Sequence, residues 1–324
     1  MAVPSASFDL LPEAGKLPIN VAVGWSGGAD STALLLALAG KGYRVHAWHV
    51  DHAWRSSSSD EAQWLTRQAA GWGIPVLTTR LPAPAGHNRE ASAREARYQC
   101  FERWAQQTGI DTLCLGHHRN DQAETVCMRL LQGAGISGCR GMLDNRRQGS
   151  LNIVRPLLHT PGSKLRQWLT ETGTGWIEDA SNHDLSIRRN HIRHRLFPAI
   201  MATGIDPAEL FLRWQQQAAR LTEMLERDVE PLLPDTSAWR HDEQGAFISW
   251  RLWSAASPPV RARLLQKMMA FVLGEGATPG RRHILLVEEW TQKSGLGGLD
   301  LSRCRLQRRR KHLHLCRTTA GLHS

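Results

Sequence analysis

The chain has 324 residues, 41% of them hydrophobic, so it can form one large α/β domain and a smaller second one, because a single hydrophobic core stops growing near ~250 residues. Its 40 lysines and arginines outnumber 30 acidic residues and give a formal net charge of +10, which favours polyanionic partners such as nucleic acid. The longest apolar stretch, residues 32–39, is too short to span a membrane, and residues 1–11 lack a secretory pattern, so we expect a cytoplasmic protein without a membrane segment.

Short apolar segments alternate with helix-like segments through the first half of the chain. The strand-like segments are 19–25, 43–50, 74–79 and 112–116. The helix-like segments are 31–38, 60–72, 90–107, 121–132 and 164–172. This alternation predicts an α/β fold with a doubly wound, mostly parallel sheet, whose ligands bind beyond the carboxyl ends of the strands.

The remainder of the chain has a different pattern. Residues 208–230 show helical periodicity and stop at Pro231, while residues 299–317 alternate apolar and basic side chains as in a hairpin with one basic face. We therefore expect a catalytic domain over residues 1–200 and a smaller, mostly helical accessory domain over residues 201–324 that ends in a basic hairpin.

A turn of small residues follows the first strand-like segment. It reads Ser26-Gly27-Gly28-Ala29-Asp30-Ser31. Glycines let backbone N–H groups approach an anion, and the helix that follows adds the positive end of its dipole. No lysine follows the glycines, so transfer of a γ-phosphate is not the obvious chemistry. The turn is predicted to bind the phosphates of a nucleotide, and the hydroxyls of Ser26 and Ser31 can donate further hydrogen bonds.

Asp30 is an unusual residue to place beside phosphates. Its negative charge would be costly there unless a cation lay between, so we assign it to a Mg²⁺ ion that bridges the nucleotide. The alternative is an ordinary strand–turn–helix junction in which Asp30 caps the helix.

Two later strings carry charged pairs at helical spacing. Arg94 and Arg97 lie one turn apart, where they could bind phosphates or a carboxylate, or could simply form a solvated basic face. Asp121 and Glu124 follow a strand-like segment and share a helix face, where they could bind an amine or a metal. The alternative for this second pair is an acidic first turn that complements the helix dipole.

A third string, residues 176–198, is polar and crowded with asparagine, aspartate and arginine, including Arg189, Asn190 and Arg193. These strings occur with His49-Val50-Asp51-His52 and Arg155-Pro156-Leu157-Leu158. In combination and order they resemble, over residues 21–198, the bacterial tRNA(Ile)-lysidine synthetases of the PP-loop ATP pyrophosphatase superfamily.

The resemblance implies a function. Enzymes of that family are ligases that activate the wobble cytidine of an isoleucine tRNA with a CAU anticodon by adenylation with ATP. They then join free L-lysine to it, giving lysidine, AMP and pyrophosphate. It implies that the loop at residues 26–31 binds ATP, with Asp30 at Mg²⁺. It assigns lysine binding and catalysis to Asp121, Glu124, Arg189, Asn190 and Arg193. It assigns contacts with tRNA or substrate to Arg94, Arg97 and His118. The sequence does not fix the oligomeric state, and a homodimer is one possibility.

One position departs from the family pattern. The family usually has two consecutive aspartates where this chain has Asn120 before Asp121. If the first aspartate supplies charge to Mg²⁺ or lysine, Asn120 weakens that step; if it supplies only a hydrogen bond, little changes. At the other end of the chain, basic residues of the expected hairpin could bind tRNA phosphates or form a solvated face; they are Arg303, Arg305, Arg308, Arg309, Arg310 and Lys311.

Three other functions compete with this interpretation. A PP-loop tRNA modifier that installs sulfur needs reactive cysteines or a cluster, whereas the 6 cysteines of this chain form no close pair. A tRNA-binding protein with an inactive ATP domain would account for Asn120. Synthesis of a small metabolite by an amidotransferase-type enzyme would require no RNA.

Overall fold

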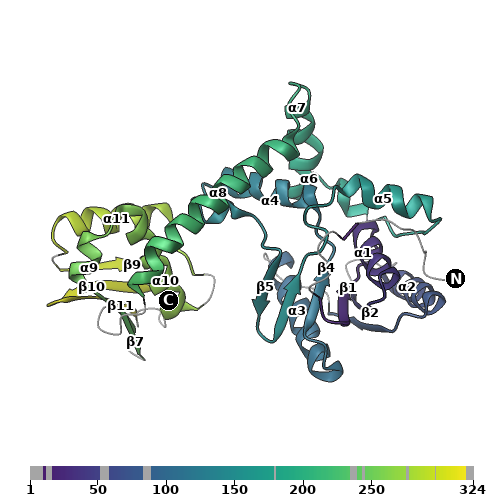
Figure 1. The fold of residues 1–324 in the computed structure, drawn as a ribbon, viewed down its shortest axis with the longest axis horizontal. Coiled ribbons are helices and arrows are strands. Elements are labelled where there is room, and N and C mark those ends of the chain that lie inside the picture. Colours follow the sequence, from purple (N-terminus) through teal and green to yellow (C-terminus); the bar gives the residue numbers. More distant parts are fainter. Residues whose placement is uncertain are drawn as a thin grey trace. The chain divides into compact units, whose positions relative to one another are not determined.

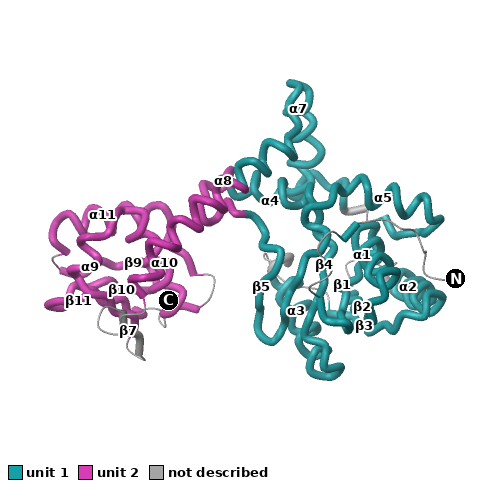
Figure 2. The backbone as a smooth tube through the Cα atoms, in the orientation of Figure 1, with its two compact units in different colours: residues 1–129, 141–215 teal, residues 130–140, 216–324 magenta. Residues whose placement is uncertain are grey.

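The computed structural model describes residues 10–11, 17–51, 58–82, 89–178, 180–233, 239–242, 245–274, 277–295 and 297–318. Two motif residues, His52 and Asp179, lie outside these ranges. The chain divides into two compact units (Figure 2): unit 1 comprises residues 1–129 and 141–215, and unit 2 comprises residues 130–140 and 216–324. Among the described residues no helix is long and apolar enough to cross a membrane.

A six-stranded sheet forms the centre of unit 1. Its strands are β1 (Asn20–Gly24), β2 (Arg44–Asp51), β3 (Val76–Arg80), β4 (Thr112–Leu115), β5 (Asn145–Gln148) and β6 (Leu151–Val154). Their order is β3-β2-β1-β4-β6-β5, and every pairing is parallel except the edge pairing of β5 with β6. This confirms the expected mostly parallel sheet. The strand order reverses between β1 and β4, which is where doubly wound sheets bind ligands.

Helices cover both faces of this sheet (Figure 1). They are α1 (Ala29–Gly40), α2 (Ser58–Trp72), α3 (Arg89–Thr108) and α5 (Gly162–Glu171). α1, α2 and α5 pack on one face, and α3 packs on the other. Residues of β1 alternate between the two cores, since Val21 and Val23 join the first and Ala22 the second. The alternation packs β1 between two cores, and the turn that follows β1 begins at the edge of this packed region.

A further group of helices packs at the edge of unit 1. Its members are α4 (Arg119–Leu131), α6 (Arg188–His191), a π-helical turn (Ile192–Leu196), α7 (Phe197–Met201) and the start of α8 (Pro207–Val229), with a 3₁₀ turn at Ala180–His183. Ala123 and Cys127 of α4 form a small core with Ile192, Phe197 and Ala208. This core fixes the first turn of α4 against the segment that carries the arginines of the third motif.

Unit 2 contains a five-stranded antiparallel sheet with helices. The strands are β7 (Trp239–Asp242), β8 (Gly245–Ser249), β9 (Gly298–Leu301), β10 (Cys304–Arg309) and β11 (His312–Arg317), in the order β7-β8-β11-β10-β9. The helices are α9 (Trp250–Ala255), α10 (Pro258–Leu273) and α11 (Arg281–Gln292), with 3₁₀ turns at Gly138–Arg140 and Glu230–Leu232. The expected hairpin is present as β10 and β11, whereas β7 and β8 were not expected from the sequence.

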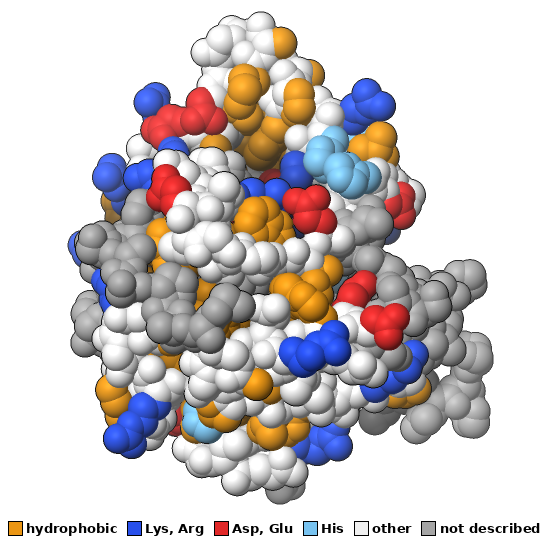
Figure 3. Space-filling view, turned by 90° about the vertical axis from the view of Figure 1, so that its right-hand side faces the viewer, with side chains coloured by type: hydrophobic (Ala, Val, Ile, Leu, Met, Phe, Trp, Pro, Cys, Tyr) orange, Lys and Arg blue, Asp and Glu red, His pale blue; other side chains and the backbone are white. Residues whose placement is uncertain are grey.

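The charge of unit 1 is mixed on the face shown in Figure 3. Lysine and arginine side chains there are dispersed among acidic and hydrophobic ones rather than gathered in one patch. The net positive charge of the chain therefore gives no single electropositive surface on this face, and binding has to be argued from individual groups.

Candidate active site

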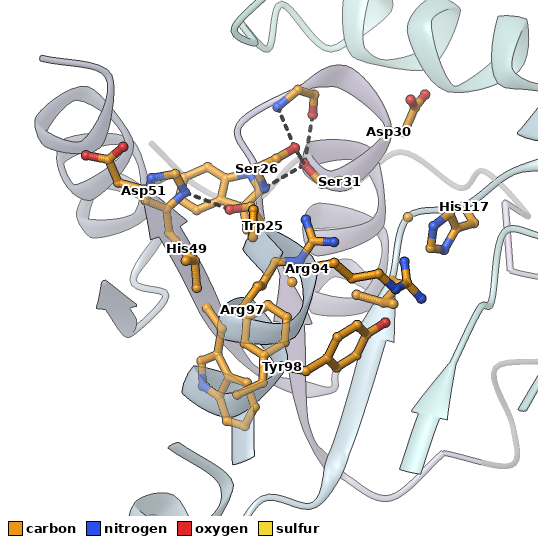
Figure 4. A pocket seen from close by; sticks show the side chains of 18 of the residues that line it. Trp25, Ser26, Asp30, Ser31, His49, Asp51, Arg94, Arg97, Tyr98 and His117 are labelled. Carbon is orange, nitrogen blue, oxygen red and sulfur yellow. Dashed lines mark hydrogen bonds between the residues drawn. The ribbon is translucent and has the colours of Figure 1, made fainter. Parts of the chain in front are cut away.

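A pocket of about 630 Å³ opens beyond the carboxyl ends of β1, β2 and β4. This volume is within the usual range for a small-molecule site. In Figure 4, His49 and Asp51 lie on one side of the loop that follows β1, and Asp30 and His117 lie on the other. The pocket thus passes along the loop at the switch point of the sheet, where the topology predicts a nucleotide site.

The loop between β1 and α1 is held open by its own hydrogen bonds. The Ser26 backbone N–H donates to Ser31 Oγ at 3.2 Å, and Ser31 Oγ donates to the Gly28 carbonyl at 3.1 Å. Gly27 has φ +84°, and a Cβ there would lie 2.7 Å from Leu65 Cδ2. Gly28 precedes α1 and provides no side-chain cap. The backbone N–H groups at the start of α1 therefore remain available to an anion.

Asp30 projects from the first turn of α1 with one oxygen unsatisfied. Its Oδ1 is buried and has no hydrogen-bond partner among the described residues, and burial raises the pKa of the carboxyl, with Asp121 adding to the effect and His118 opposing it. Within the described ranges no group of three or more histidine, cysteine or acidic side chains could hold a metal. A Mg²⁺ that arrives with a nucleotide needs only one or two carboxylates besides the phosphates, so Asp30 fits it.

The second and third motifs meet in a cluster of two carboxylates and two guanidiniums. Glu124 is 1% exposed; its carboxylate accepts from Arg189 Nε at 2.7 Å and from Arg193 Nε at 2.6 Å. Asp121 Oδ1 accepts from Arg189 Nη2 at 3.1 Å and lies 3.4 Å from Arg193 Nη2. Arg189 belongs to α6 and Arg193, four residues on, to the π-helical turn that continues it, and both side chains reach Glu124 of α4.

Asp121 stays ionised in this cluster. Its burial opposes ionisation, but the attraction of the His118 ring and of Arg189, with the backbone N–H of His118, outweighs that burial and lowers the pKa of Asp121. The cluster therefore holds equal numbers of positive and negative groups, which is the arrangement in which buried charges are tolerated.

For two predicted site residues, the sequence did not indicate that they would be buried or which groups they would contact. His118 is buried, and its Nε2 lies 3.6 Å from Asp30 Oδ2 and 3.6 Å from Asp121 Oδ2. Asn190 is also buried and donates to the Asp184 carbonyl at 3.0 Å. Asn190 thus ties down the turn before α6, while His118 stands between the loop and the cluster.

Arg94 and Arg97 line the pocket from α3. Arg94 stacks over the Tyr98 ring, 5.1 Å from its centre, and burial lowers the pKa of the half-buried Arg97, with the charge of Arg94 adding to the effect. No acidic side chain of the described residues pairs with either guanidinium. In Figure 4 both reach into the space between the loop and Tyr98. Two guanidiniums that have no acidic partner in the described part of the chain favour an anionic ligand in this pocket.

His117 lines the pocket but was not among the residues predicted from the sequence. Burial lowers the pKa of His117 to about 4, with Arg155 and Arg189 adding to the effect and Asp121 opposing it. Its Nδ1 is buried and has no partner among the described residues. The side chain is therefore uncharged at neutral pH. Its position at the carboxyl end of β4, next to His118, was the available signal.

The cysteines are reduced and sit away from the pocket lining. Five of them are buried and Cys316 is half-buried. Burial raises the pKa of Cys114 to about 12 and, with Glu124 adding, that of Cys127 to about 11. Such thiols are poor nucleophiles, because the thiolate is the reactive form. A sulfur-transfer role for them is disfavoured.

All residues that line the pocket lie within the segment of the chain that matches a known protein family. The PP-loop domain family matches residues 10–200. The chain is 34% identical over 275 residues to a tRNA(Ile)-lysidine synthase of Polaromonas naphthalenivorans, covering 84% of this chain and 80% of that protein. It is 34% identical over 223 residues to a tRNA(Ile)-lysidine synthase of Chlamydia pneumoniae, covering 68% of this chain and 69% of that protein. Among solved structures, a U34-tRNA thiolase of Methanococcus maripaludis aligns with a TM-score of 0.49 and 16% identity, covering 62% of this chain and 73% of that one.

Proposed function

Because the chain belongs to the tRNA(Ile)-lysidine synthase family of PP-loop proteins, we propose that it is a ligase joining free lysine to the wobble cytidine of an isoleucine tRNA. ATP supplies the driving force, and AMP and pyrophosphate are released. One observation carries this proposal from the family to the residues: the phosphate loop and the carboxylate–arginine cluster approach each other at His118. A nucleotide and an amino acid can therefore be held side by side.

The first half-reaction is adenylation of the cytidine. The 2-carbonyl oxygen of the base attacks the α-phosphate of ATP, and pyrophosphate leaves. The N–H groups at the start of α1 bind the phosphates, and Arg94 and Arg97 face the same space. The hydroxyls of Ser26 and Ser31 join them by turning from their contacts within the loop. When bound beside Asp30, Mg²⁺ would neutralise charge on the departing pyrophosphate. Adenylation makes the oxygen a good leaving group, since it departs as AMP.

The second half-reaction is attack by lysine. Free lysine carries a carboxylate and two amines, so a site for it needs cations and anions together, as the cluster provides. Both oxygens of Glu124 already accept from arginines, so we assign Glu124 to holding Arg189 and Arg193. Asp121 is the more accessible carboxylate, at 9% exposed against 1% for Glu124. We assign Asp121 to an amine of lysine, where it can steer the nucleophile and accept a proton.

The substitution Asp121→Asn is expected to raise the KM for lysine about 10- to 100-fold. A hydrogen bond to a charged group is worth ~1.5–3 kcal/mol, and each 1.4 kcal/mol is about tenfold. Activity should be measured over a range of lysine concentrations, with Asp144→Asn as control, because Asp144 is exposed and pairs only with His159 in the described contacts. A loss of the same size at low and at saturating lysine would remove Asp121 from lysine recognition.

The tRNA is the partner that the basic hairpin of unit 2 could hold. Two of its arginines have internal roles: Arg305 pairs with Asp300 at 2.9 Å, and Arg308 stacks over Trp250, 4.3 Å from its centre. Arg310 and Lys311, by contrast, are exposed at the tip between β10 and β11. Arg310 has φ +53°, where glycine or asparagine is usual in a two-residue hairpin turn. We propose that the arginine is kept there because it contacts RNA phosphate.

The substitution Arg310→Gly is expected to change protein stability and tRNA affinity in opposite directions. The protein is expected to gain about 1 kcal/mol of unfolding free energy, because glycine removes the left-handed strain. Its affinity for tRNA should fall, and the slope of log affinity against log salt should decrease by about 1. Arg305→Ala serves as control, because that guanidinium is already paired with Asp300. Unchanged affinity and salt slope for Arg310→Gly would exclude this turn from the interface.

Two functions remain to be separated from the proposed one by experiment. A tRNA-binding protein without catalysis would release no AMP, whereas the proposed enzyme releases AMP only when tRNA is present. Synthesis of a small metabolite would release AMP without RNA.

We also propose that the protein acts in the cytoplasm, where tRNA, ATP and free lysine occur together. Residues 1–200 are assigned to ATP chemistry and residues 201–324 to tRNA recognition.

A further inference from the structure

His118 occupies a position that the two half-reactions do not by themselves explain. It follows β4, at the amino end of α4, and is 7% exposed. Its Nε2 faces two carboxylates from separate elements, Asp30 of α1 and Asp121 of α4, each at 3.6 Å. Asp30 lines the nucleotide pocket, while Asp121 belongs to the carboxylate–arginine cluster. The imidazole is thus the side chain through which the two sites meet.

The hydrogen bonds of the other ring nitrogen define the tautomer. His118 Nδ1 accepts from the backbone N–H groups of Asn120 at 3.2 Å and of Asp121 at 3.4 Å. A backbone N–H can only donate, so Nδ1 carries no proton, and the ring hydrogen of the neutral form is on Nε2. That hydrogen points to the two carboxylates. The distances of 3.6 Å exceed a hydrogen bond, as is common before substrate tightens a site.

The start of α5 holds the ring from behind. The Gly162 N–H donates to Asn120 Oδ1 at 3.1 Å, and the Arg119 N–H donates to the Thr160 carbonyl at 2.9 Å. A Cβ on Gly162 would lie 2.9 Å from His118 Cε1 and 3.0 Å from its Nε2. Glycine is therefore required for the helix to approach the imidazole. Asn120 contributes an amide oxygen to this contact, which an aspartate would equally supply, so the position needs an acceptor and not a charge.

From these contacts we infer that His118 is a positioning residue that sets the spacing between Asp30 and Asp121. The backbone N–H groups of Asn120 and Asp121 hold it in the Nε2–H tautomer, and Gly162, fixed by the Asn120 side chain, backs the ring. Through His118 the nucleotide site and the amine site are aligned, so that lysine meets the base where it has been adenylated. The inference rests on the proposed function. It also assigns a role to Asn120, the position at which the chain departs from its family.

Two substitutions separate the roles of the two ring nitrogens. His118→Asn keeps an oxygen near the place of Nδ1 but does not reach the carboxylates, whereas His118→Gln places an amide N–H near the place of Nε2. We expect His118→Asn to lower kcat for lysine transfer about 10- to 100-fold, as loss of a supporting partner does at other sites, with little change in the KM for ATP. His118→Gln should restore most of that loss. Equal losses in both variants, or none in His118→Asn, would overturn the inference.

Gly162→Ala tests the wall behind the ring. It should lower kcat in the wild-type background but have a smaller effect in the His118→Asn background, because the clash with the ring is then gone. Gly71→Ala is the control, since a Cβ there meets nothing within 4 Å. Denaturant unfolding of each variant shows whether it is folded. Additive losses for Gly162→Ala and His118→Asn would show that the two residues act independently, against the inference.

The tautomer can be measured without any activity. In protein labelled with ¹⁵N-histidine, the ring nitrogen shifts of His118, assigned by comparison with His118→Gln, should show Nδ1 unprotonated and Nε2 protonated. A protonated Nδ1 would contradict the inference even if the enzyme makes lysidine. Conversely, a wild-type protein that transfers no lysine, yet shows the expected tautomer, would contradict the proposed function and leave the geometry of His118 standing.

Discussion

Replacing Asp30 by alanine is expected to abolish adenylation while tRNA binding is retained. The carboxylate lies beside the phosphate loop with Oδ1 buried and unsatisfied among the described residues, a position suited to a cation that accompanies ATP. Charge stabilisation of this kind contributes several kcal/mol to a transition state, so the rate of tRNA-dependent pyrophosphate release should fall by at least about 100-fold. Single-turnover release of pyrophosphate and a filter-binding measurement with tRNA give the two readouts.

A matched control for Asp30→Ala is Asp144→Ala. Asp144 also belongs to unit 1 and is ionised, its pKa being lowered first by the hydrogen bond from His159, but it is exposed. It should leave pyrophosphate release unchanged. If Asp30→Ala turned over at the wild-type rate, Asp30 would have no part in the nucleotide site. If both variants lost tRNA binding, the loss would be one of folding.

Among the proposed substitutions, Glu124→Ala is expected to lower the free energy of unfolding the most. Glu124 is 1% exposed and its carboxylate holds Arg189 and Arg193 by three hydrogen bonds. Removing one partner of a buried ion pair costs ~3–5 kcal/mol, because the remaining charge is left uncompensated. Since the arginine side chains are 34% and 33% exposed and partly solvated, we expect about 3 kcal/mol. Chemical denaturation measures it, and lysine transfer should be lost with it.

The control for Glu124→Ala is Glu209→Ala. Glu209 pairs with Arg119 at 2.7 Å and with Arg213 at 3.0 Å, but its side chain is 45% exposed. Exposed pairs contribute ~0–1 kcal/mol, so this variant should unfold close to the wild type. If Glu124→Ala were as stable as Glu209→Ala, the cluster would not fix the arginines, and the assignment of Glu124 as their support would be wrong.

The parts of the fold that the sequence predicted are those specified by local pattern. The turn at Ser26–Ser31 follows from glycines between an apolar strand and an Ala/Leu-rich helix, and the structure places it between β1 and α1. Four parallel strands and their helices were likewise expected within a few residues of where they lie. Such segments are long enough for hydrophobic periodicity to identify them.

The missed elements have short or polar sequences. β5 reads Asn-Arg-Arg-Gln and pairs only at the edge of its sheet, so it lacks the apolar alternation that identifies a strand. β7 and β8 contain 4 and 5 residues; β7 pairs with β8, and β8 joins the sheet by pairing with β11, across more than sixty residues. Their partners are set by tertiary packing, which a local pattern does not contain.

The candidate site likewise has features that the sequence predicted and features that depend on tertiary packing. Helical spacing placed Asp121 and Glu124 on one face of α4, and the family resemblance grouped them with Arg189 and Arg193. Glu124 and Arg189 are 65 residues apart, so their pairing, and the burial that makes Glu124 a support, required the structure. His118 was expected to touch tRNA or substrate; its place between Asp30 and Asp121 depends on α1 and α4 meeting in the fold, which nothing near His118 in the sequence indicates.

The proposed ligase activity is tested most directly by incubating the wild-type protein with ATP, radiolabelled lysine and an isoleucine tRNA transcript bearing the anticodon CAU. A lysidine-forming ligase should leave label on the tRNA at the wobble cytidine, with one AMP and one pyrophosphate released for each lysine joined, and no label when that cytidine is replaced by uridine. Folded protein that binds ATP and the tRNA but attaches no lysine would contradict the proposed activity.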